Sequence, residues 1–339
     1  MKLAIDVMGG DHAPQEPIRG AVDALKHVTA DIVLVGDEAV IREELKQYTY
    51  DSGRIHIVHA PDVITNDDRP VQAIKTRKES SIVVGLEMLK KGDVDAFVSA
   101  GSTGALLAGG TLKLGRIRGI DRPALTIVYP TDTGISVLTD AGANTECKPR
   151  TLMQFAVMGS LYAELVLNIS NPSVGLVNVG TEEGKGNGLV SEAYDLIKAS
   201  DLNFYGNLEA REIPAGAVDV IVCDGFTGNV ILKLSEGLVR TFSSFLKGLF
   251  GKSFFTKLAA LVVADGLRAF KKKMDYTEYG GAPFLGTSRA LVKAHGSSNG
   301  KAFMNALKYA ERYVAAGVIE SIRMKVELWK DAGETEEQE

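Results

Sequence analysis

The sequence predicts a three-layer α/β/α protein in which helices cover both faces of a largely parallel sheet. Short runs rich in Val, Ile and Leu, ending in Gly or Asp, alternate with segments of helical periodicity. Continuous apolar strands separated by helices are typical of a parallel sheet buried on both faces. No Pro- or Ser-rich linker divides the 339 residues, so we expect a single domain over residues 1–328.

Seven strands and seven helices follow from this pattern in chain order. The strands are expected at Leu3–Val7, Asp31–Val35, Ile55–Val58, Ala96–Ser99, Val137–Thr139, Val174–Val177 and Val218–Cys223. The helices are expected at Glu16–His27, Ala39–Tyr48, Ser80–Lys90, Arg150–Val166, Leu189–Lys198, Val230–Phe250 and Asn299–Val314. Residues 329–339 are acidic and lack apolar anchors, so we expect a disordered tail there.

Composition and charge narrow the class of protein. Hydrophobic residues at 45% and charged residues at 24% are ordinary for a soluble globular protein. The net charge of −5 gives no basic footprint for nucleic acid. Asp6 comes too early for a secretory signal, and the apolar runs are far too short to span a membrane. Cys147 and Cys223 form no metal-spaced pair, and two thiols in a chain this long indicate a reducing, cytoplasmic compartment.

Two segments share the pattern of a buried strand, then Gly-x-Thr-Gly, then an apolar helical run. Their residues are Gly101, Ser102, Thr103 and Gly104 in the first, and Asp224, Gly225, Thr227 and Gly228 in the second. Glycine lets backbone amides point together, and the following helix adds unpaired N–H groups and a positive dipole end. Each segment is therefore a candidate phosphate site. The alternative for either one is a tight strand-to-helix turn with a threonine N-cap, and the repetition favours the anion site.

Two further glycine-rich segments follow predicted strands, where open α/β sheets place their ligands. Their residues are Gly9, Gly10, Asp11 and His12 after the first strand, and Asn178, Gly180, Thr181, Lys185 and Asn187 after the sixth. Asp11 and His12 supply an acid–base or orienting pair, and Lys185 is a point charge for a phosphate or a phosphorylated prosthetic group. The alternatives are an ordinary turn before a Pro-capped helix and a solvated loop. Asn144 and His295 lie in smaller polar clusters.

The segment at about residues 250–275 is amphipathic, and we expect it to protrude from the domain. Its apolar residues include Phe254, Phe255, Leu258 and Leu261, and its basic end holds Lys271, Lys272 and Lys273. This composition suits a helix that lies at an anionic membrane surface. At about 1 kcal/mol per cation the attachment would be reversible. The alternative is a helix pair that packs a dimer, and both roles are compatible.

Several motifs are absent. The sequence has no G-x-S-x-G elbow, no Walker lysine motif and no H-E-x-x-H helix. It also has no G-x-G-x-x-G fingerprint, so an NAD-dependent dehydrogenase, one alternative function, lacks its main support. Cys223 stands next to Asp224, whose charge would raise the thiol pKa, and we expect a buried core thiol.

Nine motifs in order resemble the PlsX phosphate acyltransferase family over about residues 1–325. They are Met8–Pro14, Ser99–Ala105, Asp121–Ala124, Asp140–Asn144, Asn178–Glu182, Lys185–Asn187, Asp224–Asn229, Tyr279–Gly281 and Ala294–Ser297. Two positions depart from the family pattern. Ser102 stands where the family usually has Asn but still offers a hydroxyl, and Gly188 stands where the family usually has an acid.

The resemblance implies a fold similar to the isocitrate and isopropylmalate dehydrogenases and the phosphotransacetylases. It implies transfer of a long-chain fatty acyl group from acyl carrier protein to inorganic phosphate, reversibly forming acyl phosphate for phospholipid synthesis. It also implies a homodimer that supplies a membrane glycerol-3-phosphate acyltransferase, with no cofactor or metal. A cytoplasmic protein in reversible contact with the membrane surface would fit this role.

For the mechanism we expect bound phosphate to attack the thioester carbonyl directly, so that the enzyme supplies orientation and oxyanion stabilisation. The expected phosphate ligands are Gly101–Gly104 and Gly225–Gly228, helped by Asn229. Lys185 would hold phosphate or the carrier's prosthetic group, and either His12 or His295 would protonate or orient.

Docking of an acidic carrier needs a local basic patch. Arg116, Arg118, Arg122 and the 268–273 cluster are the candidates. A non-enzymatic alternative is a membrane-surface adaptor that presents the carrier protein, which would leave the glycine–threonine turns unexplained.

Overall fold

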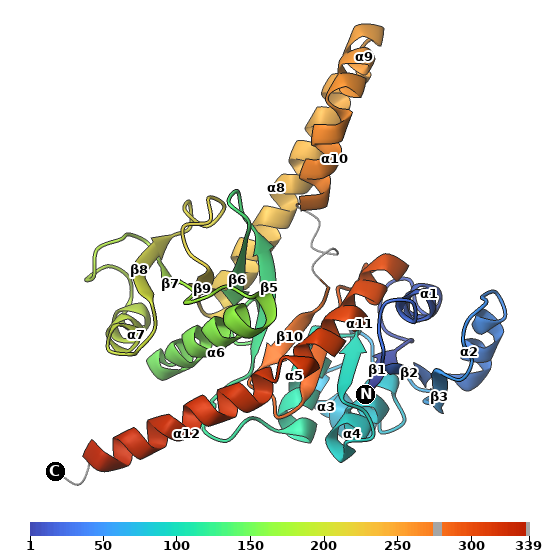
Figure 1. Cartoon of the computed structure of the whole chain (residues 1–339), viewed down its shortest axis with the longest axis horizontal. Helices are drawn as coiled ribbons and strands as arrows, with labels where there is room; N and C mark the ends of the chain where they lie inside the picture. Colours follow the sequence, from blue (N-terminus) through green and yellow to red (C-terminus); the bar gives the residue numbers. More distant parts are fainter. Residues whose placement is uncertain (274–279, 337–339) are drawn as a thin grey trace.

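An eleven-stranded sheet forms the centre of the body, and helices lie on both of its faces (Figure 1). The computed structural model describes residues 1–273 and 280–336; for Ala269, Lys271, Lys272 and residues 329–336 it describes the backbone alone. The strand order is β3-β2-β1-β4-β11-β10-β5-β6-β9-β7-β8. The chain therefore crosses the sheet and returns, because β10 and β11 insert between β4 and β5.

The elements have the following bounds. The strands are β1 (Lys2–Asp6), β2 (Asp31–Gly36), β3 (Ile55–His59), β4 (Ala96–Ser99), β5 (Ala124–Pro130), β6 (Ile135–Thr139), β7 (Val174–Asn178), β8 (Phe204–Glu209), β9 (Val220–Val222), β10 (Ala282–Leu285) and β11 (Ala290–Lys293). The helices are α1 (Gln15–Ala24), α2 (Glu38–Leu45), α3 (Pro70–Thr76), α4 (Ser81–Lys91), α5 (Thr103–Gly109), the π-helix η1 (Gly110–Leu114), α6 (Pro149–Leu167), α7 (Gly188–Lys198), α8 (Gly225–Gly251), α9 (Phe254–Val262), α10 (Ala264–Lys273), α11 (Gly300–Ala315) and α12 (Val318–Glu336).

The predicted three-layer arrangement with a largely parallel sheet is confirmed. Seven of the ten strand pairings are parallel, and only β10–β11, β10–β5 and β5–β6 are antiparallel. Successive side chains of β1 point to opposite faces of the sheet. Leu3 and Ile5 pack with α1 and α11 on one face, and Ala4 packs on the other face, on the side of α4 and α5. This alternation buries both faces of the strand, which explains its continuous apolar sequence.

The structure contains elements that the sequence pattern does not predict. These are the strands β5, β8, β10 and β11 and the helices α3 and α12. β10 and β11 have only four residues each, so their apolar content resembles that of a buried loop. The backbone of residues 329–336, within the predicted tail, is the end of α12, and residues 337–339 lie outside the described residues.

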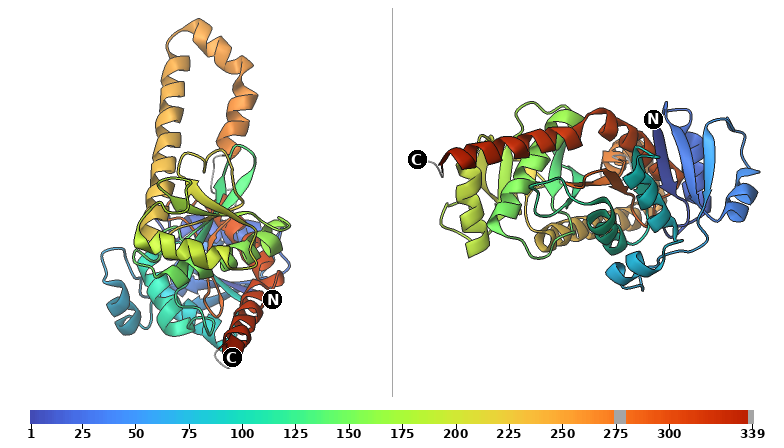
Figure 2. Two further views of the ribbon diagram at one scale, coloured as in Figure 1. Left: turned by 90° about the vertical axis from the view of Figure 1, so that its left-hand side faces the viewer. Right: turned by 90° about the horizontal axis from the view of Figure 1, so that it is seen from below.

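Helices α8, α9 and α10 form an arm that projects from the body (Figures 1 and 2). The arm begins within the 27-residue α8 and returns through α9 and α10, so it is longer than the segment about 250–275 expected from the sequence. The rings of Phe242 and Phe270 meet edge to face at 6.1 Å and join α8 to α10. Near its base, Lys273 Nζ donates to the carbonyl oxygen of Asp132 at 2.6 Å. In the described ranges, no helix has the length and apolarity to cross a membrane.

Close packing of α6 on the sheet predicts a stability effect at Gly159. A Cβ there would lie 2.7 Å from Val220 Cγ1 and 3.0 Å from Thr139 Cγ2. We expect Gly159→Val to lower the free energy of unfolding by about 1–3 kcal/mol, because an overpacked core shifts backbone and rotamers. Urea denaturation measures this change. Gly266→Ala is the control: its Cβ would meet open space, and stability should stay the same or rise. An unfolding midpoint unchanged by Gly159→Val would contradict the packing.

Candidate functional site

The predicted site residues divide into two groups at the ends of different strands. β1, β4 and β11 are adjacent and parallel, so their carboxyl ends bring together Gly9–His12, Gly101–Gly104 and His295. We call these residues the first site group. β6, β9 and β7 are likewise adjacent and parallel, and the second site group that follows them holds Asn144, Asp224–Asn229 and Asn178–Asn187.

The two glycine–threonine turns lie far apart along the sheet. Four strands separate β4 from β9. At about 4.8 Å per strand, five steps correspond to about 24 Å, several times the width of a phosphate ion. The mechanism expected from the sequence uses both turns as ligands of one phosphate, and the strand order assigns them to separate groups instead.

The buried carboxylate of Asp6 organises the first group. Asp6 Oδ2 accepts a hydrogen bond from Ser99 Oγ at 2.7 Å, and Ser99 Oγ accepts one from the Gly101 amide at 3.0 Å. Burial raises the pKa of Asp6, and its hydrogen bonds from Ser99 and the backbone oppose that rise. A Cβ at Gly9 would lie 2.5 Å from Asp6 Oδ2 and 2.7 Å from the Gly101 nitrogen, so only glycine lets the two turns approach.

The first turn keeps backbone donors open at the start of α5. Ser102 is the N-cap, and its Oγ accepts from the Ala105 amide at 3.4 Å. The amides of Ser102, Thr103 and Gly104 have no acceptor among the described residues. Unpaired first-turn amides at the positive end of a helix suit an anion. This turn therefore offers three donors to a phosphate.

Lys293, at the end of β11, lies beside the first turn; in the sequence it opens the polar cluster that contains His295, but no pattern predicts a role for it. Its Nζ donates to the carbonyl oxygens of Ala100, at 3.2 Å, and Ala294. Burial lowers the pKa of Lys293 to about 8, and the charges of Asp6 and Asp11 oppose that shift. Its signal in the sequence is its position directly before the Ala294–Ser297 motif, at the end of a strand too short to predict.

Both candidate histidines belong to the first group. The Asp11 amide donates to the carbonyl oxygen of Gly296 at 2.8 Å, which ties the His12 turn to the segment that carries His295. His295 Nδ1 lies 2.9 Å from Ser297 Oγ. Burial lowers the pKa of His295, so its imidazole is mainly neutral at pH 7. His12 is exposed.

In the second group, Asn144 is held by the buried carboxylate of Asp140. Asp140 Oδ2 accepts from the Asn144 amide at 2.7 Å and from Asn144 Nδ2 at 2.8 Å, and burial raises the pKa of Asp140. Asn144 Nδ2 also donates to the Pro123 carbonyl oxygen at 2.7 Å. The Asn144 carbonyl oxygen accepts from the Gly225 amide at 2.7 Å. The backbone amide, the carbonyl oxygen and Nδ2 of Asn144 are therefore occupied in joining β6 to the start of α8.

The second turn is a capped helix start. Asp224 is the N-cap of α8: its Oδ1 accepts from the Thr227 amide at 2.9 Å and its Oδ2 from Thr227 Oγ1 at 2.8 Å. The Gly228 amide donates to the Asp224 carbonyl oxygen at 2.9 Å. A Cβ at Gly142 would lie 3.5 Å from Asn229 Oδ1, which places that side chain beside the Asp140–Asn144 segment. Fewer donors are free here than at the first turn.

Lys185 lies on an exposed loop beyond β7. Asn178 Nδ2 donates to the Lys185 carbonyl oxygen at 2.9 Å and closes the loop that contains Gly180 and Thr181. Lys185 Nζ is 4.0 Å from Glu182 Oε1, and its side chain is 54% exposed. Asn187 caps α7 by accepting from the Val190 amide at 3.0 Å. The loop therefore presents Lys185 to solvent at the edge of the second group.

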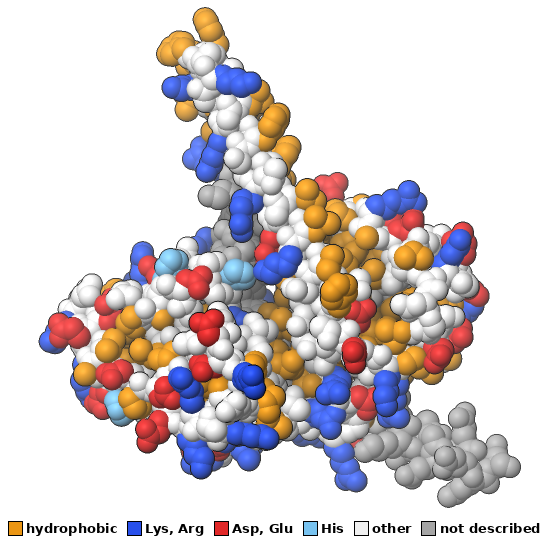
Figure 3. Space-filling view, turned by 180° about the vertical axis from the view of Figure 1, so that it is seen from behind, with side chains coloured by type: hydrophobic (Ala, Val, Ile, Leu, Met, Phe, Trp, Pro, Cys, Tyr) orange, Lys and Arg blue, Asp and Glu red, His pale blue; other side chains and the backbone are white. Residues whose placement is uncertain are grey.

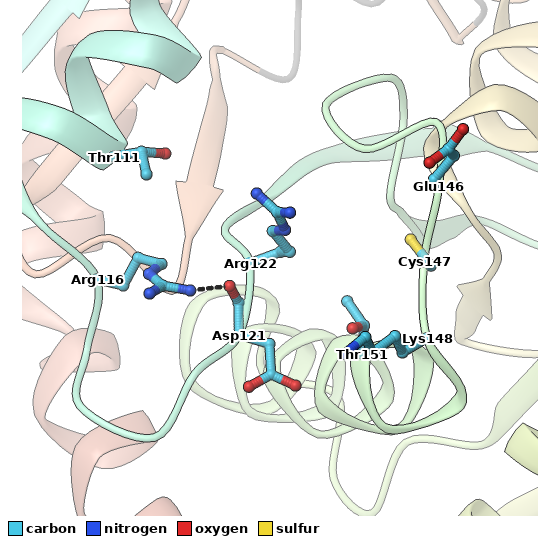
Figure 4. A pocket seen from close by; sticks show the side chains of 8 residues that line it. All are labelled: Thr111, Arg116, Asp121, Arg122, Glu146, Cys147, Lys148 and Thr151. Atoms are coloured by element: carbon cyan, nitrogen blue, oxygen red, sulfur yellow. Dashed lines mark hydrogen bonds between the residues drawn. The ribbon is translucent and has the colours of Figure 1, made fainter.

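A surface cavity of about 630 Å³ borders the second group (Figure 4). It is lined by Thr111, Arg116, Asp121, Arg122, Glu146, Cys147, Lys148 and Thr151. Burial, with the charges of Asp140 and Asp224, raises the pKa of Cys147 to about 12, so this residue stays a thiol. Cys223 is buried as expected, and burial raises its pKa as well. Neither thiol has the environment of a catalytic nucleophile.

Open amides and a half-buried lysine at the strand ends of a parallel sheet define an α/β enzyme of the class that binds phosphate groups. The chain belongs to the phosphate acyltransferase family described as fatty acid synthesis protein, which matches residues 1–321. It is 58% identical to the phosphate acyltransferase of Alkaliphilus oremlandii over 322 residues, 95% of this chain and 96% of that protein. It is 51% identical to that of Thermoanaerobacterium thermosaccharolyticum, covering 98% of both chains. It is accordingly an acyltransferase that uses phosphate and an acyl donor.

Solved structures confirm the expected fold. A phosphotransacetylase from Streptococcus pyogenes superposes with a TM-score of 0.64 at 15% identity, covering 93% of this chain and 94% of that one. The 4-hydroxythreonine-4-phosphate dehydrogenase from Klebsiella pneumoniae superposes with a TM-score of 0.50 at 13% identity, covering 92% and 98%. At such identities the likeness concerns the fold alone.

The pKa of Lys293 predicts a pH dependence. If the ammonium group supports a bound anion, turnover should fall as pH rises through about 8, where Lys293 loses its proton. We expect Lys293→Met to lower kcat by about tenfold to a hundredfold, the range for a lost charged hydrogen bond, and to remove this descending limb. Initial rates between about pH 6.5 and 9.5 measure it. Lys90→Met, on the exposed surface of α4, is the control. A rate that rises through pH 8 would assign Lys293 to base catalysis instead.

Proposed function

We propose that this enzyme transfers a long-chain fatty acyl group from acyl carrier protein to inorganic phosphate, reversibly forming acyl phosphate for phospholipid synthesis. The observation that supports this proposal most strongly is the first turn, whose three open amides lie beside the half-buried ammonium of Lys293 in a member of the phosphate acyltransferase family. The acyl phosphate would pass to a membrane glycerol-3-phosphate acyltransferase. The enzyme would be cytoplasmic and reversibly bound at the membrane surface.

In the proposed reaction, a phosphate oxygen attacks the thioester carbonyl carbon. The C–O bond forms, the C–S bond breaks and the sulfur leaves, while the proton lost by hydrogen phosphate balances the one that the free thiol gains. The amides of Ser102–Gly104 and the Lys293 ammonium would orient the phosphate and stabilise the oxyanion. His12 or His295, at the same strand ends, would relay the proton.

The second group would then serve the acyl donor. Asn229 lies beside Gly142 at the start of α8, and Lys185 is the exposed cation at the edge of this group. Because the second turn has few free donors, we expect the side chains of Asn229 and Lys185 to make the contacts with the acyl donor. Its ligand would be the carrier's prosthetic arm rather than inorganic phosphate.

Purified enzyme should release free carrier protein from palmitoyl-acyl carrier protein only when phosphate is present. Hydroxylamine should trap the acyl phosphate as a hydroxamate, and gel shift of the carrier measures the release. Lys185→Ala should slow the release without lowering the melting temperature, because its side chain is exposed.

An intact thioester with the carrier bound would favour the adaptor alternative. Fluorescence titration with NAD tests the dehydrogenase alternative, for which we expect no binding.

We also propose two contacts for the arm. A stripe of apolar side chains along α8, 41% to 66% exposed, suits packing against a second copy of this chain in a homodimer. The stripe consists of Phe226, Val230, Leu234, Leu238, Phe242, Phe245 and Leu249. At the end of the arm, Phe254, Phe255, Leu258 and Leu261 of α9 are 45% to 80% exposed and suit contact with a membrane surface.

Figure 3 shows hydrophobic side chains at the end of the arm, with lysine and arginine side chains nearby along it. Lys273 belongs to the basic end of α10, as do Lys271 and Lys272, whose side chains lie outside the described residues. Apolar insertion with flanking cations is the pattern of reversible attachment to an anionic bilayer.

Substitutions on the arm separate the two contacts. We expect the double variant Phe254→Glu and Leu258→Glu to lose flotation with liposomes that contain anionic lipid, because two carboxylates oppose apolar insertion. The variant should keep its oligomeric state in sedimentation equilibrium. Leu238→Glu, on the α8 stripe, is the matched substitution and should weaken self-association. If the double variant floats as well as the wild type, the proposed membrane contact is wrong. If the wild-type protein sediments as a monomer, the proposed dimer is wrong.

A further inference from the structure

The cavity beside the second group gathers cations that have no acidic partner. Arg116, Arg122 and Lys148 line it, and none of the three lies within 4 Å of a carboxylate in the described ranges. Arg116 donates instead to the carbonyl oxygen of Asp121, and the Asp121 carboxylate lies 3.9 Å from Arg150 Nε. All three cationic residues are exposed, so a ligand can reach them from solvent.

The arrangement of these cations suits a phosphate group. In Figure 4 the side chains of Arg116 and Arg122 extend toward the same space, and Glu146 lies on the side away from Arg116. The Arg122 charge acts on Cys147 across the cavity, where it opposes the rise in the thiol pKa. Guanidinium groups bind phosphate oxygens through paired N–H donors, which gives both charge and geometric match. Thr111 and Thr151 add hydroxyl groups to the lining.

The cavity is continuous with the second group but separate from the first. Arg122 precedes Pro123, whose carbonyl oxygen accepts from Asn144, and Cys147 Sγ lies 3.6 Å from the Asn144 carbonyl oxygen. Three strands separate β4, which ends at the first turn, from β6, which leads into Asp140–Asn144. Four steps of about 4.8 Å give about 19 Å between these strands.

We propose that Arg116, Arg122 and Lys148 bind the phosphodiester of the carrier's phosphopantetheine arm, an inference that rests on the proposed function. The phosphopantetheine chain has about 13 bonds between phosphorus and sulfur, so its extended length is roughly 15 Å at about 3.5 Å per three backbone bonds. Thr111, which lines the cavity, lies eight residues beyond Thr103 of the first turn, about 12 Å away along α5 and η1 at 1.5 Å per residue, so a chain of this length can reach from that side of the cavity to the first turn. A phosphodiester in the cavity therefore directs the thioester along the enzyme toward the first turn, where phosphate attacks. The cavity acts as an anchor that positions the donor.

Small donors isolate this contact from docking of the carrier. We would compare palmitoyl-phosphopantetheine with palmitoyl-pantetheine, which lacks the phosphate, and measure kcat/KM for phosphate-dependent thioester cleavage. Wild-type enzyme should prefer the phosphorylated donor by at least about tenfold, the effect of one charged contact. Arg122→Ala and Lys148→Ala should reduce this ratio toward one, with the KM for inorganic phosphate unchanged. Lys90→Ala is the control, because Lys90 is an exposed cation on α4 and does not line the cavity.

Each outcome has a separate meaning. Equal use of the two donors by wild-type enzyme, with cleavage still dependent on phosphate, overturns the anchor and leaves the proposed function intact. A raised KM for inorganic phosphate in Arg122→Ala, with the donor ratio unchanged, assigns the cavity to the phosphate co-substrate and overturns the inference. Phosphate-independent cleavage, or none even from palmitoyl-acyl carrier protein, contradicts the proposed function itself. Melting temperatures of the variants exclude misfolding, and Arg122→Lys should retain part of the preference.

Discussion

The hydrogen bond between the buried Asp6 carboxylate and Ser99 joins the ends of β1 and β4, and the first site group is built around it. A carboxylate removed from water needs donors, and Ser99 Oγ and the surrounding amides supply them. Because Ser99 Oγ also accepts from the Gly101 amide, the following turn is fixed in place. The amides of Ser102, Thr103 and Gly104 are then left without an acceptor among the described residues. The buried charge thus positions a turn that can receive an external anion.

The sequence predicts those parts of the fold and site that depend on local patterns. Gly101–Gly104 is recognisable because glycines follow an apolar strand and precede a helical run, and the structure confirms that setting. Lys293 is not recognisable in the same way, since β11 has four residues and its burial depends on β4 and β10 on either side. The division of the site into two groups is also hidden, because it follows from the insertion of β10 and β11 into the middle of the sheet.

Helix α8 connects the two groups with the arm. It begins at the Asp224 cap in the second group, and Ser235, about 16 Å further along at 1.5 Å per residue, lies 2.7 Å from the Tyr129 hydroxyl. Near this point the charges of Lys233 and Glu236 act on His295 of the first group. The same helix then leaves the body and carries the exposed apolar stripe. A contact made by the arm therefore acts on an element that touches both groups.

The two glycine–threonine turns show why one sequence pattern supports different electrostatics. In the second turn the cap is Asp224, whose two oxygens take the amide and hydroxyl of Thr227. This carboxylate places a negative charge at the positive end of α8. There it accepts the first-turn hydrogen bonds of the helix and repels an incoming phosphate. In the first turn the cap is the neutral Ser102, which takes a single amide at 3.4 Å and leaves the dipole end uncompensated. The N-cap residue, which lies inside the pattern in the first turn and before it in the second, decides which turn can bind an anion, and the half-buried Lys293 ammonium reinforces the difference.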